Sequence, residues 1–239
     1  MTSDSNLTNE SYLSLVDDPL SLFDKLKSIH NKWYLDGKVD RPESDDVLRY
    51  LNNDQGINVV LLAIQAMQRG KSAFNLIDVL NPVLPTLVVQ PDDIIALWKE
   101  LYERTTNDMA SGRQYDELTN LLKAKPNMVG ELLSLLSQTN EPFVIGYISE
   151  IYLSSAANEF LGTFEELITL SASKNEFEVI ASINALGRLK YSGKNKPLIT
   201  RVLKRYEDLE INASKEVLFA LVQSHGWLLM AFPHKSGPF

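Results

Sequence analysis

The chain contains no cysteine, and this absence excludes two kinds of architecture. Without thiols there is neither a disulfide framework nor a zinc site that needs thiolate ligands. Histidine is scarce too, since only His30, His225 and His234 occur, and no two of them have the spacing of metal ligands. We therefore expect no bound metal.

Long apolar runs and an export signal are also missing. The most apolar stretch, Val79–Val89, is broken by Asn81, Pro82 and Pro85, so it falls short of the ~20 apolar residues that a membrane span needs. The amino-terminal residues MTSDSNLTNESYL include no Lys or Arg and no apolar core, unlike a signal peptide. The sequence predicts a cytoplasmic protein without membrane association.

Basic residues are fewer than acidic ones, with 23 Lys and Arg against 31 Asp and Glu. The formal net charge is therefore −8 and the pI is near 5.0. A nucleic-acid coat binds by neutralising phosphates with Lys and Arg, so we do not expect nucleic acid as the general partner. An acidic chain is better suited to another protein with a basic surface.

No catalytic motif is present either. Gly70-Lys71-Ser72 imitates the end of a P-loop, but Gln65 stands where the motif needs its first glycine, and the preceding pattern is helical. A turn with Gly70 after a helix is the better interpretation. We expect no catalytic residue and no cofactor.

What the chain does contain is helical periodicity. Its first part, residues 13–125, has an irregular series of amphipathic segments after a flexible start at 1–12. Prolines and their preceding cap residues mark several boundaries. The predicted helices include one beginning at Asp18-Pro19, Ile57–Gln68, Ala73–Leu80, one beginning at Pro91, and Tyr115–Leu122.

From residue 126 to 230 the apolar positions recur every 35 residues, which predicts three helix-pair units, the last of them partial, before a tail at 231–239. Capping boxes are predicted at Asn175 with Glu178 and at Thr163 with Glu166. The matching positions are Val129, Phe164 and Ile199; Leu132, Leu167 and Val202; Leu133, Ile168 and Leu203; Ile148, Ile183 and Leu218; and Ile151, Leu186 and Leu221.

These units resemble HEAT-type repeats. The likeness lies in the capped first helix containing Ala185-Leu186-Gly187 and in a second helix opened by Pro197, although Ile180 replaces the basic residue usual after the first-helix Val. The resemblance implies an all-α fold, a right-handed α-solenoid of stacked antiparallel helix pairs with about 11–12 helices. It also implies that second helices line a concave face that binds macromolecules.

Candidate partner-binding residues come from those second helices and from a basic run at 188–205. Glu131, Glu166 and Arg201 share one position in the period, so the charge reverses along one ridge. Trp227 is added as an aromatic anchor. The full set is Glu131, Glu165, Glu166, Arg201, Lys204, Arg205 and Trp227.

Three functions fit these observations. The first is a non-catalytic protein-binding solenoid, in its sharper form an inhibitor or immunity-type protein that neutralises a basic enzyme or toxin. The second is a HEAT-like DNA-repair glycosylase or nucleic-acid-binding protein that uses the basic stretch 188–205. The third is an adaptor subunit of a larger assembly, which differs from the first mainly in its partner.

Overall fold

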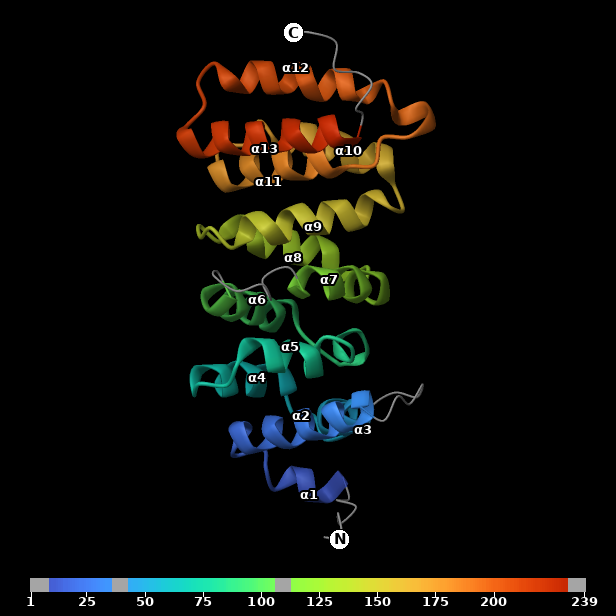
Figure 1. Ribbon diagram of the computed structural model, residues 1–239, viewed down its shortest axis with the longest axis vertical. Coiled ribbons are helices and arrows are strands. Elements are labelled where there is room, and N and C mark those ends of the chain that lie inside the picture. The colour runs from blue at the N-terminus through green and yellow to red at the C-terminus, as the bar shows by residue number, and fades with distance from the viewer. Residues whose placement is uncertain (1–8, 36–42, 106–112, 232–239) are drawn as a thin grey trace. The chain divides into compact units, whose positions relative to one another are not determined.

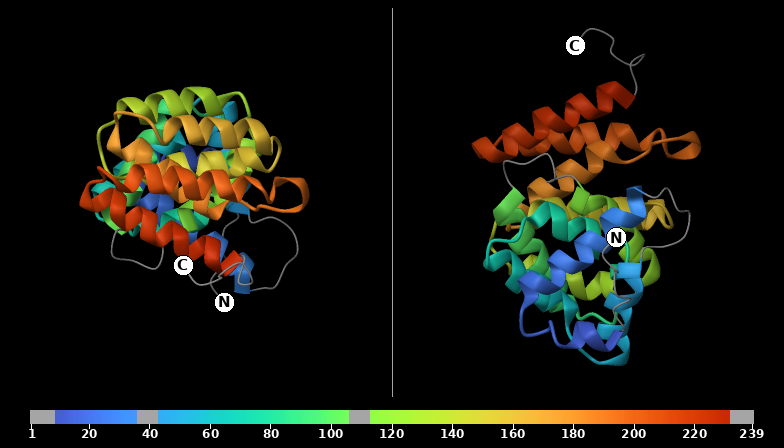
Figure 2. Two further views of the ribbon diagram at one scale, coloured as in Figure 1. Left: turned by 90° about the horizontal axis from the view of Figure 1, so that it is seen from above. Right: turned by 60° about the horizontal axis from the view of Figure 1, so that its bottom comes forward.

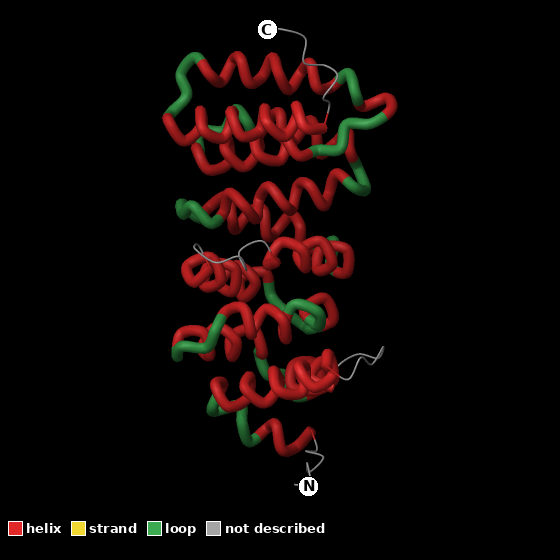
Figure 3. The backbone as a smooth tube through the Cα atoms, in the orientation of Figure 1, coloured by secondary structure: helices red, strands yellow, loops and turns green. Residues whose placement is uncertain are grey.

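All regular structure in the described part of the chain is helical. The computed structural model describes residues 9–35, 43–105 and 113–231, and thirteen α-helices lie within these ranges (Figures 1 and 3). The all-α prediction is confirmed. Residues 1–8 of the predicted flexible start at 1–12 lie outside the described residues, as do part of the loop before Glu43 and tail residues 232–239 with His234; residues 9–12 are helical. None of the described helices is both long and apolar enough to cross a membrane.

The chain divides into two compact units, Met1–Leu132 and Leu133–Phe239. In the first unit, α2 packs against α3, α4 and α5, and α4 packs against α6. The helices of this unit are α1 (Asn9–Leu13), α2 (Pro19–Leu35), α3 (Glu43–Arg49) with the π-helix Tyr50–Asp54, α4 (Val59–Gln68), α5 (Ala73–Leu80), the 3-10 turn Leu84–Thr86, α6 (Pro91–Thr105) and α7 (Arg113–Ala124), and α8 (Met128–Gln138) begins in it.

The turn at Gly70 confirms the interpretation of the P-loop imitation as a helix end. Gly70 has φ +100°, a left-handed conformation that favours glycine. Its N–H donates to the Met67 carbonyl, and the N–H of Lys71 donates to that of Ala66, which is the Schellman pattern. Lys71 forms an ion pair with Asp24 on α2. The fold therefore accounts for Gly70 and Lys71 of the imitation without a bound phosphate.

The second unit is built around α11. This helix packs against both α9 and α13, while α10 contacts α9 and α11, and α12 contacts α13. Figure 2 shows α13 (red) and α12 (orange) from two further sides. The elements are α9 (Val144–Ala156), α10 (Phe160–Leu170), α11 (Glu176–Arg188), a 3-10 turn at Gly193–Asn195, α12 (Leu198–Glu210) and α13 (Lys215–Ala231).

Burial follows most of the predicted period. Leu132, Leu167 and Val202 are fully buried, as the apolar alignment requires. In the first helices, Ile148 and Ile183 are buried, but Leu218 at the equivalent position is 39% exposed. The equivalent face is therefore buried in α9 and α11, whereas in α13 it is partly exposed.

Polar contacts fix the spacing between α11 and its neighbours. The hydroxyls of Ser224 on α13 and Tyr206 on α12 lie 2.5 Å apart, and each lies 3.0 Å from the Ile183 carbonyl oxygen. On the α9 side, Ser149 donates to the Ala181 carbonyl oxygen at 2.9 Å. All these groups are buried, so the bonds satisfy them and hold the helices in one register.

One of the two predicted capping boxes is wrong and the other is modified. Thr163 lies inside α10, buried, because that helix begins a turn earlier at Phe160. Asn175 does cap α11, since its side chain accepts the N–H of Phe177 at 3.0 Å. Glu178, however, accepts from Ser173, whose hydroxyl oxygen accepts the N–H of Asn175. A serine thus stands between the two members of the box.

Candidate protein-binding surface

An acidic hollow lies in the second unit where α9, α10 and the start of α11 meet. Its volume is ≈ 690 Å³, and three carboxylates line it, from Glu165, Glu166 and Glu178. Tyr152 of α9 also lines the hollow, together with the α10–α11 connection. Two of these acids, Glu165 and Glu166, are sequence candidates, whereas Tyr152 and Glu178 are additions that only the folded chain brings to them.

Local structure sets the position of each acidic group. Glu165 and Glu166 are exposed on α10, and Glu178 stands in the first turn of α11. An acidic side chain is favoured there by the helix dipole, and the hydrogen bond from Ser173 orients it. Within the described part of the chain, Glu166 has no hydrogen bond or ion pair of its own. It is therefore the carboxylate most available to a ligand.

The hollow changes the acidity of its tyrosine. Burial, and after it the negative charges of Glu166 and Glu178, raise the pKa of the Tyr152 hydroxyl to about 12. The hydroxyl, neutral at physiological pH even at its ordinary pKa of 10.0, therefore stays neutral further into the alkaline range. A neutral phenol beside carboxylates offers an oxygen acceptor and a ring face, and both suit a cationic group.

This shift predicts an alkaline weakness of the fold. Below the ordinary pKa of 10.0 the hydroxyl is neutral in both states, so its contribution to stability is complete. Between pH 10 and about 12 the unfolded chain ionises first, and stability falls as pH rises. Tyr152→Phe should remove the phenolate absorbance step near pH 12 and reduce the fall in unfolding temperature over that range. Unchanged absorbance titration would contradict the assignment.

Arg201 pairs with Glu165 instead of standing alone on the predicted ridge. Its guanidinium donates two hydrogen bonds to the Glu165 carboxylate, at 2.6 and 2.9 Å, and lies 5.0 Å from the centre of the Phe164 ring. The hydrogen bonds hold the pKa of Glu165 below its usual range. Arg201, the basic residue of the predicted charge reversal, therefore links α12 to α10 through Glu165, the neighbour of Glu166.

Arg205 is also engaged within the fold. Its Nε donates to the Ser171 hydroxyl at 2.7 Å, and an Nη donates to the Ser171 carbonyl oxygen at 2.8 Å. Ser171 follows the last residue of α10, where carbonyl groups lack partners inside the helix. Arg205 thus closes the carboxyl end of α10.

Removing that closure should lower stability. We expect Arg205→Ala to reduce the free energy of unfolding by about 1–2 kcal/mol, because the hydroxyl and carbonyl oxygens of the buried Ser171 lose the two hydrogen bonds that the guanidinium donates. Urea denaturation measures the effect. Its matched control is Lys204→Ala, since Lys204 is the exposed neighbour and should leave the midpoint unchanged. Equal effects of the two changes would argue against the closing role.

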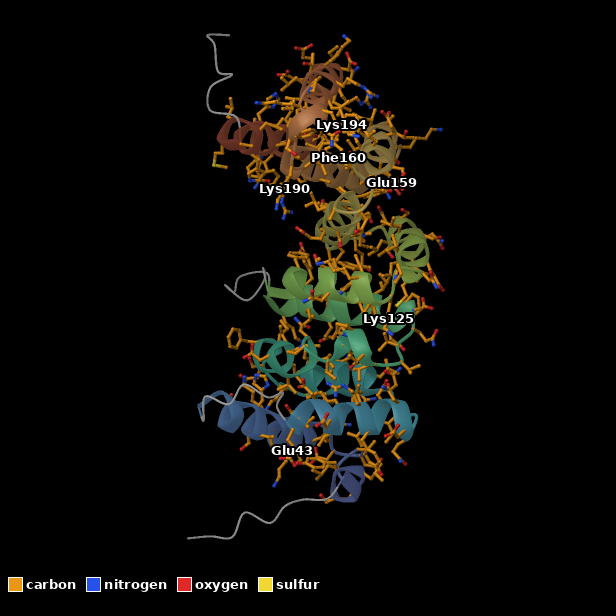
Figure 4. The ribbon with its side chains drawn as sticks, turned by 90° about the vertical axis from the view of Figure 1, so that its right-hand side faces the viewer. Glu43, Lys125, Glu159, Phe160, Lys190 and Lys194 are labelled. Carbon is orange, nitrogen blue, oxygen red and sulfur yellow. The ribbon has the colours of Figure 1, made fainter. Side chains whose placement is uncertain are left out.

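Two other members of the basic run, Arg188 and Lys190, line a second, smaller hollow of ≈ 280 Å³. Arg188 at its edge forms an ion pair with Glu150 and lies 5.8 Å from the ring of Trp227. Lys190 also lines it, over an apolar floor that includes Phe160. Figure 4 shows Glu159, Phe160, Lys190 and Lys194 gathered at one end of these helices. The basic run is therefore divided: Arg188 and Lys190 line this second hollow, whereas Arg201 and Arg205 bind groups of α10 and of the residue that follows it.

The remaining candidates are not brought to the acidic hollow. Trp227 is half-buried on α13 beneath Arg188, and Lys204 is exposed on α12. Glu131 is exposed in the first turn of α8 and belongs to the first compact unit. Within the described residues, no group of three His, Asp or Glu side chains is placed to hold a metal ion.

Comparisons of the chain with models of protein families, with curated proteins and with solved structures find no match in any of the three. The resemblance to HEAT-type repeats therefore stays a prediction from the residues, and any function has to be argued from the chain itself.

Proposed function

We propose that this protein is a non-catalytic α-solenoid that binds a basic protein through the acidic hollow formed by Tyr152, Glu165, Glu166 and Glu178. The observation that carries the proposal is the convergence of three carboxylates and a neutral tyrosine on one cavity of ≈ 690 Å³. Such a site suits a lysine or arginine side chain projecting from a partner.

The arrangement of α9 to α13 supports the solenoid part of the proposal. A first helix that packs against the preceding and the following first helix is the contact pattern of stacked hairpins, and α11 makes both contacts. The shared burial of Leu132, Leu167 and Val202 agrees with a HEAT-like unit. Stacked units present their second helices, here α10 and α12, as a continuous surface for a partner.

The charge supports an inhibitor or immunity-type role as the sharper form. A chain with net charge −8 attracts a basic enzyme or toxin over a long range, and an acidic pocket then fixes one of its cations. An adaptor subunit would use the same surface with another partner. The nucleic-acid alternative is less favoured, because Arg188, Arg201 and Arg205 are all engaged by groups of the second unit.

Affinity capture from the native cell tests this function. The wild-type chain, Glu166→Lys and Glu207→Lys serve as baits, since both changes raise the net charge equally and Glu207 is exposed on α12 outside the hollow. We expect the wild type and Glu207→Lys to retain the same basic protein, released by moderate salt, and Glu166→Lys to lose it. Retention by all three baits, or of acidic proteins alone, would overturn the proposal.

A further inference from the structure

The outer face of α13 carries a row of exposed apolar side chains. Phe219, Val222 and Met230 are 71%, 73% and 73% exposed. Helical spacing brings the members onto one face, since they recur at intervals of three and four residues. We define the α13 stripe as Leu218, Phe219, Val222, Gly226, Leu229 and Met230.

The repeat indicates that this face is built to contact a helix. In the period of 35, Val222 corresponds to Gly187, the residue at which α11 approaches Ser224 of α13. Leu218 corresponds to Ile183, which is fully buried. The stripe is thus the counterpart of the α11 face that packs on the next first helix, and no described residue covers it.

Gly226 adds a second, independent observation. A Cβ atom at this position would have no heavy atom within 4 Å, so nothing in the described fold requires glycine there. Glycine in the interior of a helix is nevertheless disfavoured relative to alanine. Gly226 leaves a notch in the helix surface between Val222 and Met230, each four residues away. Such a notch allows the backbone of a second helix to approach closely.

We propose that the occupant of the stripe is the same stripe of a second copy of the chain, in an antiparallel two-fold arrangement about residue 224. This register places Val222 opposite Gly226 of the second copy, so the largest side chain at the centre enters the notch. It also places Leu218 opposite Met230 and Phe219 opposite Leu229. Every member of the stripe then meets another member, as a closed two-fold interface requires.

Charge and area agree with self-association. From Val217 to Ala231 the helix carries no Asp, Glu, Lys or Arg, so two copies meet there without like charges although each has net charge −8. The side chains of the stripe expose on the order of 600 Å² in one copy, and two copies together reach the lower range of stable interfaces, about 1,200 Å². Complete burial of the stripe in both copies would thus give an interface at the lower limit for a stable dimer.

Sedimentation velocity over a concentration series tests the proposal. We expect a wild-type dimer at about 100 µM. Val222→Glu and Gly226→Leu should each raise the dissociation constant at least tenfold, with unchanged helical circular dichroism. Leu161→Glu is the matched control, since Leu161 is an exposed leucine of α10 outside the stripe, and it should leave the dimer intact.

Introduced cysteines test the register, because the chain has no other thiol. A mixture of Val222→Cys and Gly226→Cys chains should form a disulfide-linked heterodimer under mild oxidation, faster than a mixture of Leu218→Cys and Gly226→Cys chains. A wild-type monomer at every concentration, or equal cross-linking of both mixtures, would overturn the proposal. So would a monomer that dimerises only after residues 232–239 are deleted, since that result assigns the stripe to the chain's own tail.

Discussion

Gly187→Ala is expected to lower the free energy of unfolding of the second unit substantially. An added Cβ would lie 2.9 Å from the Cβ and 3.0 Å from the Cα of Ser224, and closer still to its hydroxyl oxygen. Two helix backbones must separate to admit it, and overpacking of this kind costs about 1–3 kcal/mol. Separation also breaks or strains the hydrogen bonds of Ser224 and Tyr206 to Ile183, which costs about 1 kcal/mol for each of the two bonds. After a gain of about 1 kcal/mol in helix propensity, we expect a net loss of about 2–4 kcal/mol.

Urea denaturation followed by circular dichroism measures this loss. The matched control is Gly130→Ala in α8, where an added Cβ meets nothing within 4 Å, and its stability should stay equal or rise slightly. A double variant with Ser224→Gly should be more stable than the sum of the single costs predicts, because the clash is shared. Strict additivity would indicate that α11 and α13 do not approach closely at Gly187.

Phe164→Ala is expected to cost about 3–5 kcal/mol, the range for emptying a large aromatic site in a core. Phe164 is fully buried, and its ring meets Tyr191 edge to face with centroids 6.4 Å apart. On its other contact, the ring lies 5.0 Å from the Arg201 guanidinium. The substitution therefore loosens the core and frees the arginine that pairs with Glu165.

Thermal and urea unfolding of Phe164→Ala should be compared with Leu161→Ala, a neighbour on α10 that is 51% exposed. The control should change stability by less than about 1 kcal/mol. Phe164→Leu, which refills most of the space, should fall between them. A cost for Phe164→Ala no larger than that of the control would contradict the position of α10 in the core.

The helices themselves could be predicted because their boundary signals are local. Pro19 and Pro91 begin helices where expected, α5 ends at Leu80 before Asn81-Pro82, and Asn175 caps α11. The apolar period also located Leu132, Leu167 and Val202 in the core, but it aligned Leu218 with buried residues although Leu218 is 39% exposed. Thr163 misled because a threonine three residues before a glutamate resembles a cap even when its side chain is buried inside a helix.

The contacts between helices could not be predicted, because they depend on which side chains face each other after packing. Glu165 and Arg201 looked like separate surface charges, yet they are partners. Tyr152 gave no signal beyond an apolar helix, and Glu178 looked like one half of a capping box. The acidic hollow is thus a product of the fold, and sequence spacing identified only the two adjacent glutamates of α10 among its members.

The central claim is that the acidic hollow of the second unit recognises a cation of a basic partner. Backbone amide chemical shifts of the labelled chain, followed during titration with an octalysine peptide, test it most directly. We predict the largest changes at Tyr152, Glu166, Thr169 and Glu178, all of which line the hollow, and their loss in Glu166→Lys but not in Glu207→Lys. Changes spread evenly over the exposed acids, such as Asp46 and Asp92, or equal in the two variants, would contradict the claim.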